Sequence, residues 1–143
     1  MDKIEFRKQV VDDDHVAGIL INGVPLARLA EDHEVPRYEL KSDYLGLPLS
    51  DVAPPAGHFR GAAEPHYDYN GRIQVLGCSC GNPGCWPLVC VISTSADTVT
   101  WSDFRQPFRD VGSDQGHWSY DGFGPFTFDR VQYEAALAAL ALA

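Results

Sequence analysis

Three of the four cysteines lie in one short stretch, Cys78-Ser-Cys80-Gly-Asn-Pro-Gly-Cys85. Thiolates with this spacing could bind a tetrahedral zinc ion, which takes sulfur ligands at about 2.3 Å. The glycines and the proline permit a tight turn with positive φ angles, so the three sulfur atoms can converge. The spacing therefore predicts that any special chemistry of this chain, metal binding or redox, is centred on residues 78–85.

The turn itself does not supply a fourth zinc ligand. Cys90 lies on the order of 16 Å beyond Cys85 along a strand that rises about 3.3 Å per residue, so it is predicted to be a small core residue. The other candidates are His58, His66 and His117, among which His66 is nearest in the chain to the turn. The predicted metal ligands are Cys78, Cys80, Cys85 and His66.

Two other states of the turn remain open. The thiols could stay reduced without a metal, as parts of a glycine-rich turn, or Cys78 or Cys80 could form a disulfide with Cys85. A thiolate nucleophile would need Cys80 or Cys85 to meet His66 or His117 and a third orienting group, which the spacing does not indicate. The chain also lacks the nucleophile elbow, the P-loop and the dinucleotide-binding glycine motif.

Two resemblances involve this turn. Locally, Cys78, Cys80 and Cys85 with Gly81 resemble the zinc knuckle of post-SET segments, where the fourth thiolate comes from an attached methyltransferase domain that has no counterpart here. This resemblance implies a metal-binding geometry and no activity. More broadly, Cys-x-Cys-Gly-x-x-Gly-Cys-Trp-Pro from residue 78 and Gly-Pro-Phe-x-Phe-Asp-Arg-x-Gln-Tyr from residue 124 resemble a family of small bacterial proteins of unknown function.

The segments around the turn are predicted to be strands that position it. Residues 73–77 lead into the turn, residues 86–94 lead out of it, and residues 98–104 follow after a short polar break. Such a succession predicts a three-stranded antiparallel meander. Phe126 and Phe128 alternate as in a last strand.

The N-terminal third is predicted to form a hairpin and a helix. Residues 3–11 and 16–21 read as two antiparallel strands, the first with its apolar face at Ile4, Phe6 and Val10. The helical spacing of Leu26, Leu29, Ala30 and His33 then predicts a short amphipathic helix over residues 25–34. Pro36 is predicted to end it.

The predicted last helix begins at Asp129. Gln132 stands at the capping-box position, and Phe128 with Tyr133 at the hydrophobic-staple positions. Its apolar seam, Tyr133, Leu137 and Leu140, should pack on the sheet. The predicted fold class is therefore α+β: an antiparallel sheet, made of the N-terminal hairpin and the meander, with a C-terminal helix packed on one face.

Prolines and glycines interrupt all periodicity between about residues 51 and 71. A segment of this kind is predicted to be a long loop, either a lid or recognition loop or an ordinary surface excursion. The whole chain, residues 1–143, is predicted to be one domain, because 143 residues that are 45% hydrophobic suffice for a single core.

The net charge of −9 opposes binding to phosphate backbones and to anionic membranes. We therefore expect neither nucleic acid nor a membrane as a partner. The start of the chain lacks the apolar region of a signal peptide, and the longest apolar run, residues 135–143, is shorter than the ~20 residues that span a bilayer. These features predict a cytoplasmic protein.

For function, we expect a non-enzymatic interaction module of a regulatory or immunity type, whose acidic surface suits a basic protein partner. The alternative is a small thiol-dependent enzyme or redox sensor that uses a cysteine of the 78–85 turn. The C-terminal aromatic residues, with Arg105, Gln106 and Arg109, could form a pocket or an interface. Most of these aromatic residues are predicted to be core instead, and Arg105 and Arg109 are the residues that a core least explains.

Overall fold

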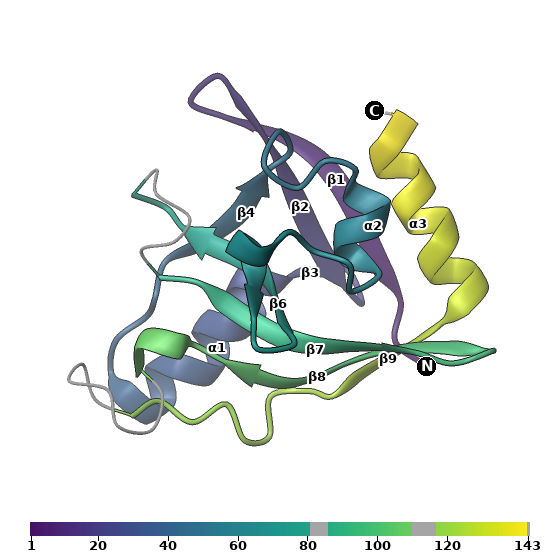
Figure 1. Ribbon diagram of the computed structural model, residues 1–143. Coiled ribbons are helices and arrows are strands. Elements are labelled where there is room, and N and C mark those ends of the chain that lie inside the picture. The colour runs from purple at the N-terminus through teal and green to yellow at the C-terminus, as the bar shows by residue number, and fades with distance from the viewer. Residues whose placement is uncertain (81–85, 110–116, 143) are drawn as a thin grey trace.

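The computed structural model describes residues 1–80, 86–109 and 117–142 and shows an antiparallel sheet with a C-terminal helix packed against it (Figure 1). The strands are β1 (Ile4–Val11), β2 (Asp14–Ile21), β3 (Val24–Pro25), β4 (Tyr44–Pro48), β5 (Asp68–Tyr69), β6 (Arg72–Cys78), β7 (Leu88–Thr94), β8 (Thr98–Arg105) and β9 (Phe126–Asp129). The helices are α1 (Leu26–Tyr38), α2 (Pro55–Phe59) and α3 (Arg130–Leu142), with the short 3-10 helices η1 (Pro65–Tyr67) and η2 (Pro107–Arg109). The predicted α+β class is confirmed.

The strand order is β1-β2-β4-β6-β7-β8-β9, with β3 paired to β2 and β5 paired to β6. The predicted hairpin is β1–β2, and the predicted meander is β6–β7–β8. The two ends of the sheet meet where Asp2 pairs with Phe128. There the Asp2 N–H donates to the Thr127 carbonyl at 2.9 Å, and the Thr127 N–H donates to Asp2 Oδ2 at 3.0 Å. In Figure 1 the N-terminus accordingly lies beside β9.

The β1–β2 hairpin is buried only in its first half. Ile4 and Phe6 are buried, whereas Val10, on the same face by alternation, is 64% exposed. Val10 is exposed because the hairpin is longer than the core that it covers, and its tip extends beyond the core in Figure 1. The predicted apolar face is therefore a core face at Ile4 and Phe6 alone.

Helix α1 has the predicted apolar face, but the prediction that Pro36 ends it is wrong. The helix continues to Tyr38 and ends at Glu39, whose backbone is left-handed with φ 59° and donates to the Val35 carbonyl at 2.9 Å. Proline removes only one donor when it sits in the last turn. In the same turn, Arg37 Nη1 donates to the His33 carbonyl at 2.8 Å.

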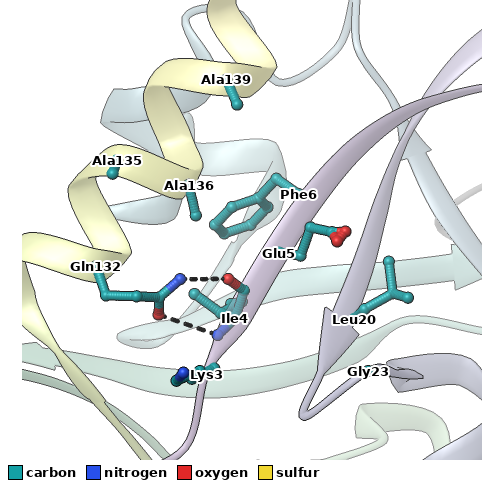
Figure 2. Close-up of a pocket in the computed structure, with 10 residues that line it drawn as sticks. All are labelled: Lys3, Ile4, Glu5, Phe6, Leu20, Gly23, Gln132, Ala135, Ala136 and Ala139. Carbon is teal, nitrogen blue, oxygen red and sulfur yellow. Dashed lines mark hydrogen bonds between the residues drawn. The ribbon is translucent and has the colours of Figure 1, made fainter.

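Helix α3 starts as predicted but uses Gln132 differently. Asp129 caps the helix, since its Oδ2 accepts the Gln132 N–H at 3.0 Å. The Gln132 side chain does not return to Asp129 as in a capping box. Instead its Oε1 accepts the Ile4 N–H at 3.1 Å and its Nε2 donates to the Ile4 carbonyl at 2.6 Å (Figure 2). The side-chain amide of Gln132 thus joins α3 to the edge of β1 by two hydrogen bonds.

Replacing Gln132 by alanine is expected to lower the free energy of unfolding by about 1–2 kcal/mol, because two hydrogen bonds to Ile4 are lost. Urea unfolding would measure the change. The matched control is Val131→Ala on the exposed side of the same helical turn, which should change stability by less than about 0.5 kcal/mol. Equal effects of the two substitutions would show that the Gln132 bonds do not stabilise the fold.

The segment between residues 51 and 71 is not a plain loop, since it contains α2, η1 and β5. Phe59 is fully buried, with its ring centroid 4.9 Å from that of Phe6. Tyr133 of α3 donates its hydroxyl hydrogen to the Phe59 carbonyl and accepts from Trp101 Nε1 at 3.1 Å. The expectation of a lid or surface excursion is therefore wrong for α2, which belongs to the core.

No helix in the described part of the chain is long and apolar enough to cross a membrane.

Candidate functional site

The first part of the cysteine turn is visible at the end of β6. Cys78 pairs with Tyr44 of β4 and is half-buried, whereas Cys80 is exposed. The Cys80 N–H donates to Cys78 Sγ at 3.4 Å, and Ser79 Oγ donates to Asp43 Oδ2 at 3.3 Å. Cys85 lies outside the described residues, so the predicted convergence of three sulfur atoms stays a prediction.

The predicted fourth ligand, His66, is exposed on η1, and its ring centroid lies 6.0 Å from that of Tyr67. Among residues 1–80, 86–109 and 117–142, no three or more His, Cys, Asp or Glu side chains are grouped so that they could hold a metal ion. A zinc site at the turn would thus need at least one ligand outside the described residues, such as Cys85. His117 is exposed, and His58 is buried with its Nε2 at 2.7 Å from the Gln74 carbonyl.

Cys90 lies on β7 and is fully buried, as predicted. Burial raises the pKa of its thiol well above the ordinary value. Because the thiolate is the reactive form, burial disfavours reaction at Cys90, which packs as a core residue.

Protonation of His58 is expected to destabilise the protein. Burial lowers the pKa of His58 below its ordinary value of 6.5, with the bond to the Gln74 carbonyl opposing that shift. The folded state therefore binds fewer protons than the unfolded state, and stability falls as the pH drops through about 6.5. The slope from this residue is at most about 1.4 kcal/mol per pH unit.

Urea unfolding at pH 7 and pH 5 would measure this slope for the wild type and for His58→Asn. The variant should lose less stability between the two pH values than the wild type does. An unchanged difference between pH 7 and pH 5 would assign the acid sensitivity to other groups.

A stack of aromatic rings surrounds Arg109, which ends η2. Its Cζ lies 4.2 Å from the ring centroid of Trp86 and 3.7 Å from that of Trp118. Trp118 in turn stacks on Tyr38 of α1 at 4.7 Å with an interplanar angle of 7°. The Trp118 N–H donates to the Arg109 carbonyl at 2.6 Å, which holds the two residues together.

Among the described residues, the guanidinium of Arg109 is held by aromatic rings and pairs with no carboxylate. Its Nε and Nη1 atoms are buried and have no hydrogen-bond partner within the described parts of the chain. A guanidinium is weakly hydrated and stacks well on aromatic faces, so it suits this position better than a lysine would. The ring stack therefore explains Arg109, one of the two arginines that the predicted core least explained.

The other, Arg105, has a different role. Its Nε donates to Asp103 Oδ1 at 3.3 Å, and Asp103 also pairs with Arg72 of β6. Asp103 has a left-handed backbone with φ 52° where the register of β7 and β8 shifts, which is typical of a β-bulge. Arg105 and Arg72 thus share one carboxylate across the sheet.

Exposed apolar side chains adjoin the Arg109 stack. The Trp86 and Phe108 ring centroids lie 6.3 Å apart, and Phe108 is 43% exposed. Val35 and Leu40, on either side of Tyr38 in the chain, are also exposed. We define the aromatic patch as Tyr38, Trp86, Phe108, Arg109 and Trp118.

Beneath the aromatic patch lies a buried carboxylate that sequence analysis missed. Glu34 of α1 is 1% exposed. Its Oε1 accepts the Ser42 N–H at 2.8 Å, and its Oε2 accepts Ser42 Oγ at 3.1 Å and the Tyr120 hydroxyl. Glu34 stands four residues after Ala30 on the buried face, and this spacing was the signal that could have revealed it.

Two tyrosines and a histidine complete this buried network. The hydroxyls of Tyr44 and Tyr120 lie 2.8 Å apart, and burial raises the pKa of both, so both stay neutral. His33 stacks on Tyr120 with ring centroids 5.4 Å apart, and its Nε2 lies 2.9 Å from the Ser119 carbonyl.

The network fixes the position of the patch. The Tyr38 hydroxyl accepts the Ser119 N–H at 2.7 Å and lies 3.2 Å from the Ser119 carbonyl, to which it donates. Ser119 joins Trp118 of the patch to Tyr120 of the network. The last turns of α1 are therefore bound to the segment that carries Trp118, and the stack cannot shift without breaking these hydrogen bonds.

Comparison of the chain with protein-family models, with curated proteins and with solved structures found no match. The function is therefore proposed from the chemistry of the residues.

Proposed function

We propose that this chain is a non-enzymatic interaction module and that its aromatic patch binds a protein partner. The observation that carries the proposal is the Arg109 guanidinium held between Trp86 and Trp118, with exposed Phe108 beside it. Trp, Tyr and Arg dominate the hot spots of protein interfaces. Side chains that are already held in place lose little conformational entropy on binding, which favours affinity.

The partner is expected to be basic. The chain carries a net charge of −9, and exposed carboxylates lie on α1 and just after it. These residues are Glu31, Asp32, Glu39 and Asp43. Carboxylates on and just after α1, the helix that carries Tyr38 of the patch, favour the approach of a lysine- or arginine-rich surface. A regulatory or immunity-type role suits such an interface.

The test is affinity capture from lysate of the source cells with three forms of the protein. The wild type should retain a partner at ~50 mM salt and release it at ~500 mM, because salt screens exposed charges. Phe108→Ser should retain at least about tenfold less, whereas Val131→Ser on the exposed face of α3 should retain as much as the wild type. Capture of a partner that changes neither with the salt concentration nor with the Phe108→Ser substitution would contradict the proposal.

The second candidate is a thiol or zinc function at the cysteine turn. It is favoured by the exposure of Cys80 and by the N–H···S contact between Cys80 and Cys78. Elemental analysis and thiol titration of the purified protein distinguish the cases. About one zinc per chain with protected thiols indicates a metal-stabilised turn, whereas a rapidly reacting cysteine at neutral pH indicates a redox or catalytic thiol.

A further inference from the structure

The Arg109 guanidinium carries hydrogen-bond donors that the described residues do not use. Its Nε and Nη1 are buried without an acceptor in the ranges 1–80, 86–109 and 117–142. Glu34, the carboxylate beneath the aromatic patch, does not serve Arg109, because its two oxygen atoms accept from Ser42 and Tyr120. Burying donors without an acceptor destabilises a fold. Stacking on the rings therefore explains how a cation is held here, but it leaves these donors without a role.

The third nitrogen of the guanidinium, Nη2, forms the accessible edge of Arg109. The described residues offer Nη2 no hydrogen-bond partner, and Nη2 is not one of the buried atoms that lack a partner, so it faces solvent. The Arg109 Cζ lies 4.2 Å from the ring centroid of Trp86 and 3.7 Å from that of Trp118, and these rings keep water from the rest of the guanidinium. An acceptor from another molecule can therefore reach Arg109 at Nη2, beside the tryptophan rings.

A carboxylate is the acceptor that this edge favours. A hydrogen bond between a guanidinium and a carboxylate is roughly twice as strong as one between neutral groups. The surrounding rings lower the local dielectric constant, which strengthens the attraction further. A dianionic phosphate would bring twice the negative charge to a chain whose net charge is already −9, so phosphate is the less favourable ligand.

The charge of the whole chain and the charge of Arg109 act at different distances. The net charge of −9 attracts a basic surface during its approach. At contact, the centre of the aromatic patch offers a cation, Arg109, that pairs with no carboxylate of the described residues. The best complement is thus a basic surface that presents one carboxylate at its centre. A surface without that carboxylate would bury Arg109 unpaired, at a cost in affinity.

We propose that the partner of the aromatic patch inserts an aspartate or glutamate side chain whose carboxylate accepts a hydrogen bond from Arg109 Nη2. This inference rests on the proposed function of the patch and identifies the contact at its centre. The rings of Trp86 and Trp118, with the exposed Phe108 beside them, exclude water from the ion pair. Arg109 thereby selects, among basic surfaces, those that carry the carboxylate.

A pair of small probes tests the contact without the partner. 4-Phenylbutyrate and 4-phenylbutyramide share an apolar body and differ in the carboxylate. At ~150 mM salt, which screens the net charge of the chain, the carboxylate should shift the NMR signals of the Arg109 Nε–H and the Trp118 indole. It should bind at least about fivefold more tightly than the amide. Arg109→Met, which keeps an unbranched side chain beside the rings, should abolish this difference. Equal binding of the two probes to the wild type would overturn the proposal.

Affinity capture with the same variant tests the contact in the complex with the partner. Arg109→Met makes the chain more acidic, so charge steering alone predicts stronger capture of a basic partner. Loss of the carboxylate contact instead predicts capture that is at least about tenfold weaker. The matched control, Arg28→Met, removes an exposed cation of α1 and should not weaken capture. Loss of capture with Phe108→Ser but not with Arg109→Met would overturn the carboxylate contact alone, whereas loss with neither would contradict the function of the patch itself.

A carbodiimide identifies the source of the carboxylate, because it condenses an amine with a carboxylate in contact with it. In Arg109→Lys, the introduced amine should form an amide with an internal aspartate or glutamate of the captured partner, which mass spectrometry would locate. An amide formed only with the C-terminal carboxylate of the partner would overturn the assignment to a side chain.

Discussion

Glu34→Ala is expected to lower the free energy of unfolding by about 3–5 kcal/mol. The carboxylate accepts three hydrogen bonds, from Ser42 N–H, Ser42 Oγ and the Tyr120 hydroxyl, in a site that is 1% exposed. Its removal leaves buried donors unsatisfied, at about 1–3 kcal/mol each, and opens a cavity. Chemical denaturation at neutral pH would measure the loss.

The control for this prediction is Glu31→Ala, an exposed glutamate one turn earlier on α1 whose contact with Lys41 spans 3.8 Å. Glu31→Ala should lower the free energy of unfolding by less than about 1 kcal/mol, because exposed ion pairs contribute little to stability. Because Glu34 also positions Tyr120 and the patch, Glu34→Ala should broaden the NMR signals of the Trp118 indole. A loss below about 1 kcal/mol for Glu34→Ala would mean that the network is not a main support of the fold.

Phe59→Ala is also expected to lower the free energy of unfolding by about 3–5 kcal/mol, because truncating a fully buried phenylalanine leaves a large cavity. Its ring contacts those of Phe6 and Trp101, with centroids 4.9 and 6.3 Å away. The thermal midpoint and the urea midpoint should both fall. This result would establish that α2 is an integral part of the core.

Phe108→Ala is the matched control, because Phe108 is 43% exposed. This substitution should lower the free energy of unfolding by less than about 1 kcal/mol. If α2 were instead a mobile lid, Phe59→Ala would resemble Phe108→Ala in its effect on stability. Equal small losses would therefore contradict the packing of α2 against Phe6 and Trp101.

The hairpin, the meander and the last helix could be predicted from the sequence because their signals are local. Alternating apolar residues marked β1, and Asp129 marked the start of α3 as an N-cap. The strand β4 was not predicted, since its partners lie far away in the chain. Gly46 reads as a loop residue, yet a Cβ there would lie 2.4 Å from the Ala17 carbonyl oxygen. Glycine at this position permits β2 and β4 to pair closely.

The candidate site was only partly predictable. Cysteine spacing predicted a turn at residues 78–85, of which the structure describes only residues 78–80. Sequence analysis also found no core role for Arg109. The stack of Arg109 on Trp86 and Trp118 depends on contacts between segments distant in the sequence. The buried role of Glu34 depends likewise on Ser42 and Tyr120, which no local pattern connects to it.

The most direct test of the aromatic patch as a binding surface is site-specific photo-cross-linking in the source cells. A photoreactive phenylalanine analogue would replace Phe108 in one variant and Val131, exposed on α3, in the other. The patch proposal predicts a discrete cross-linked partner from position 108 and none from position 131. Absence of an adduct at position 108, or the same adducts from both positions, would contradict it.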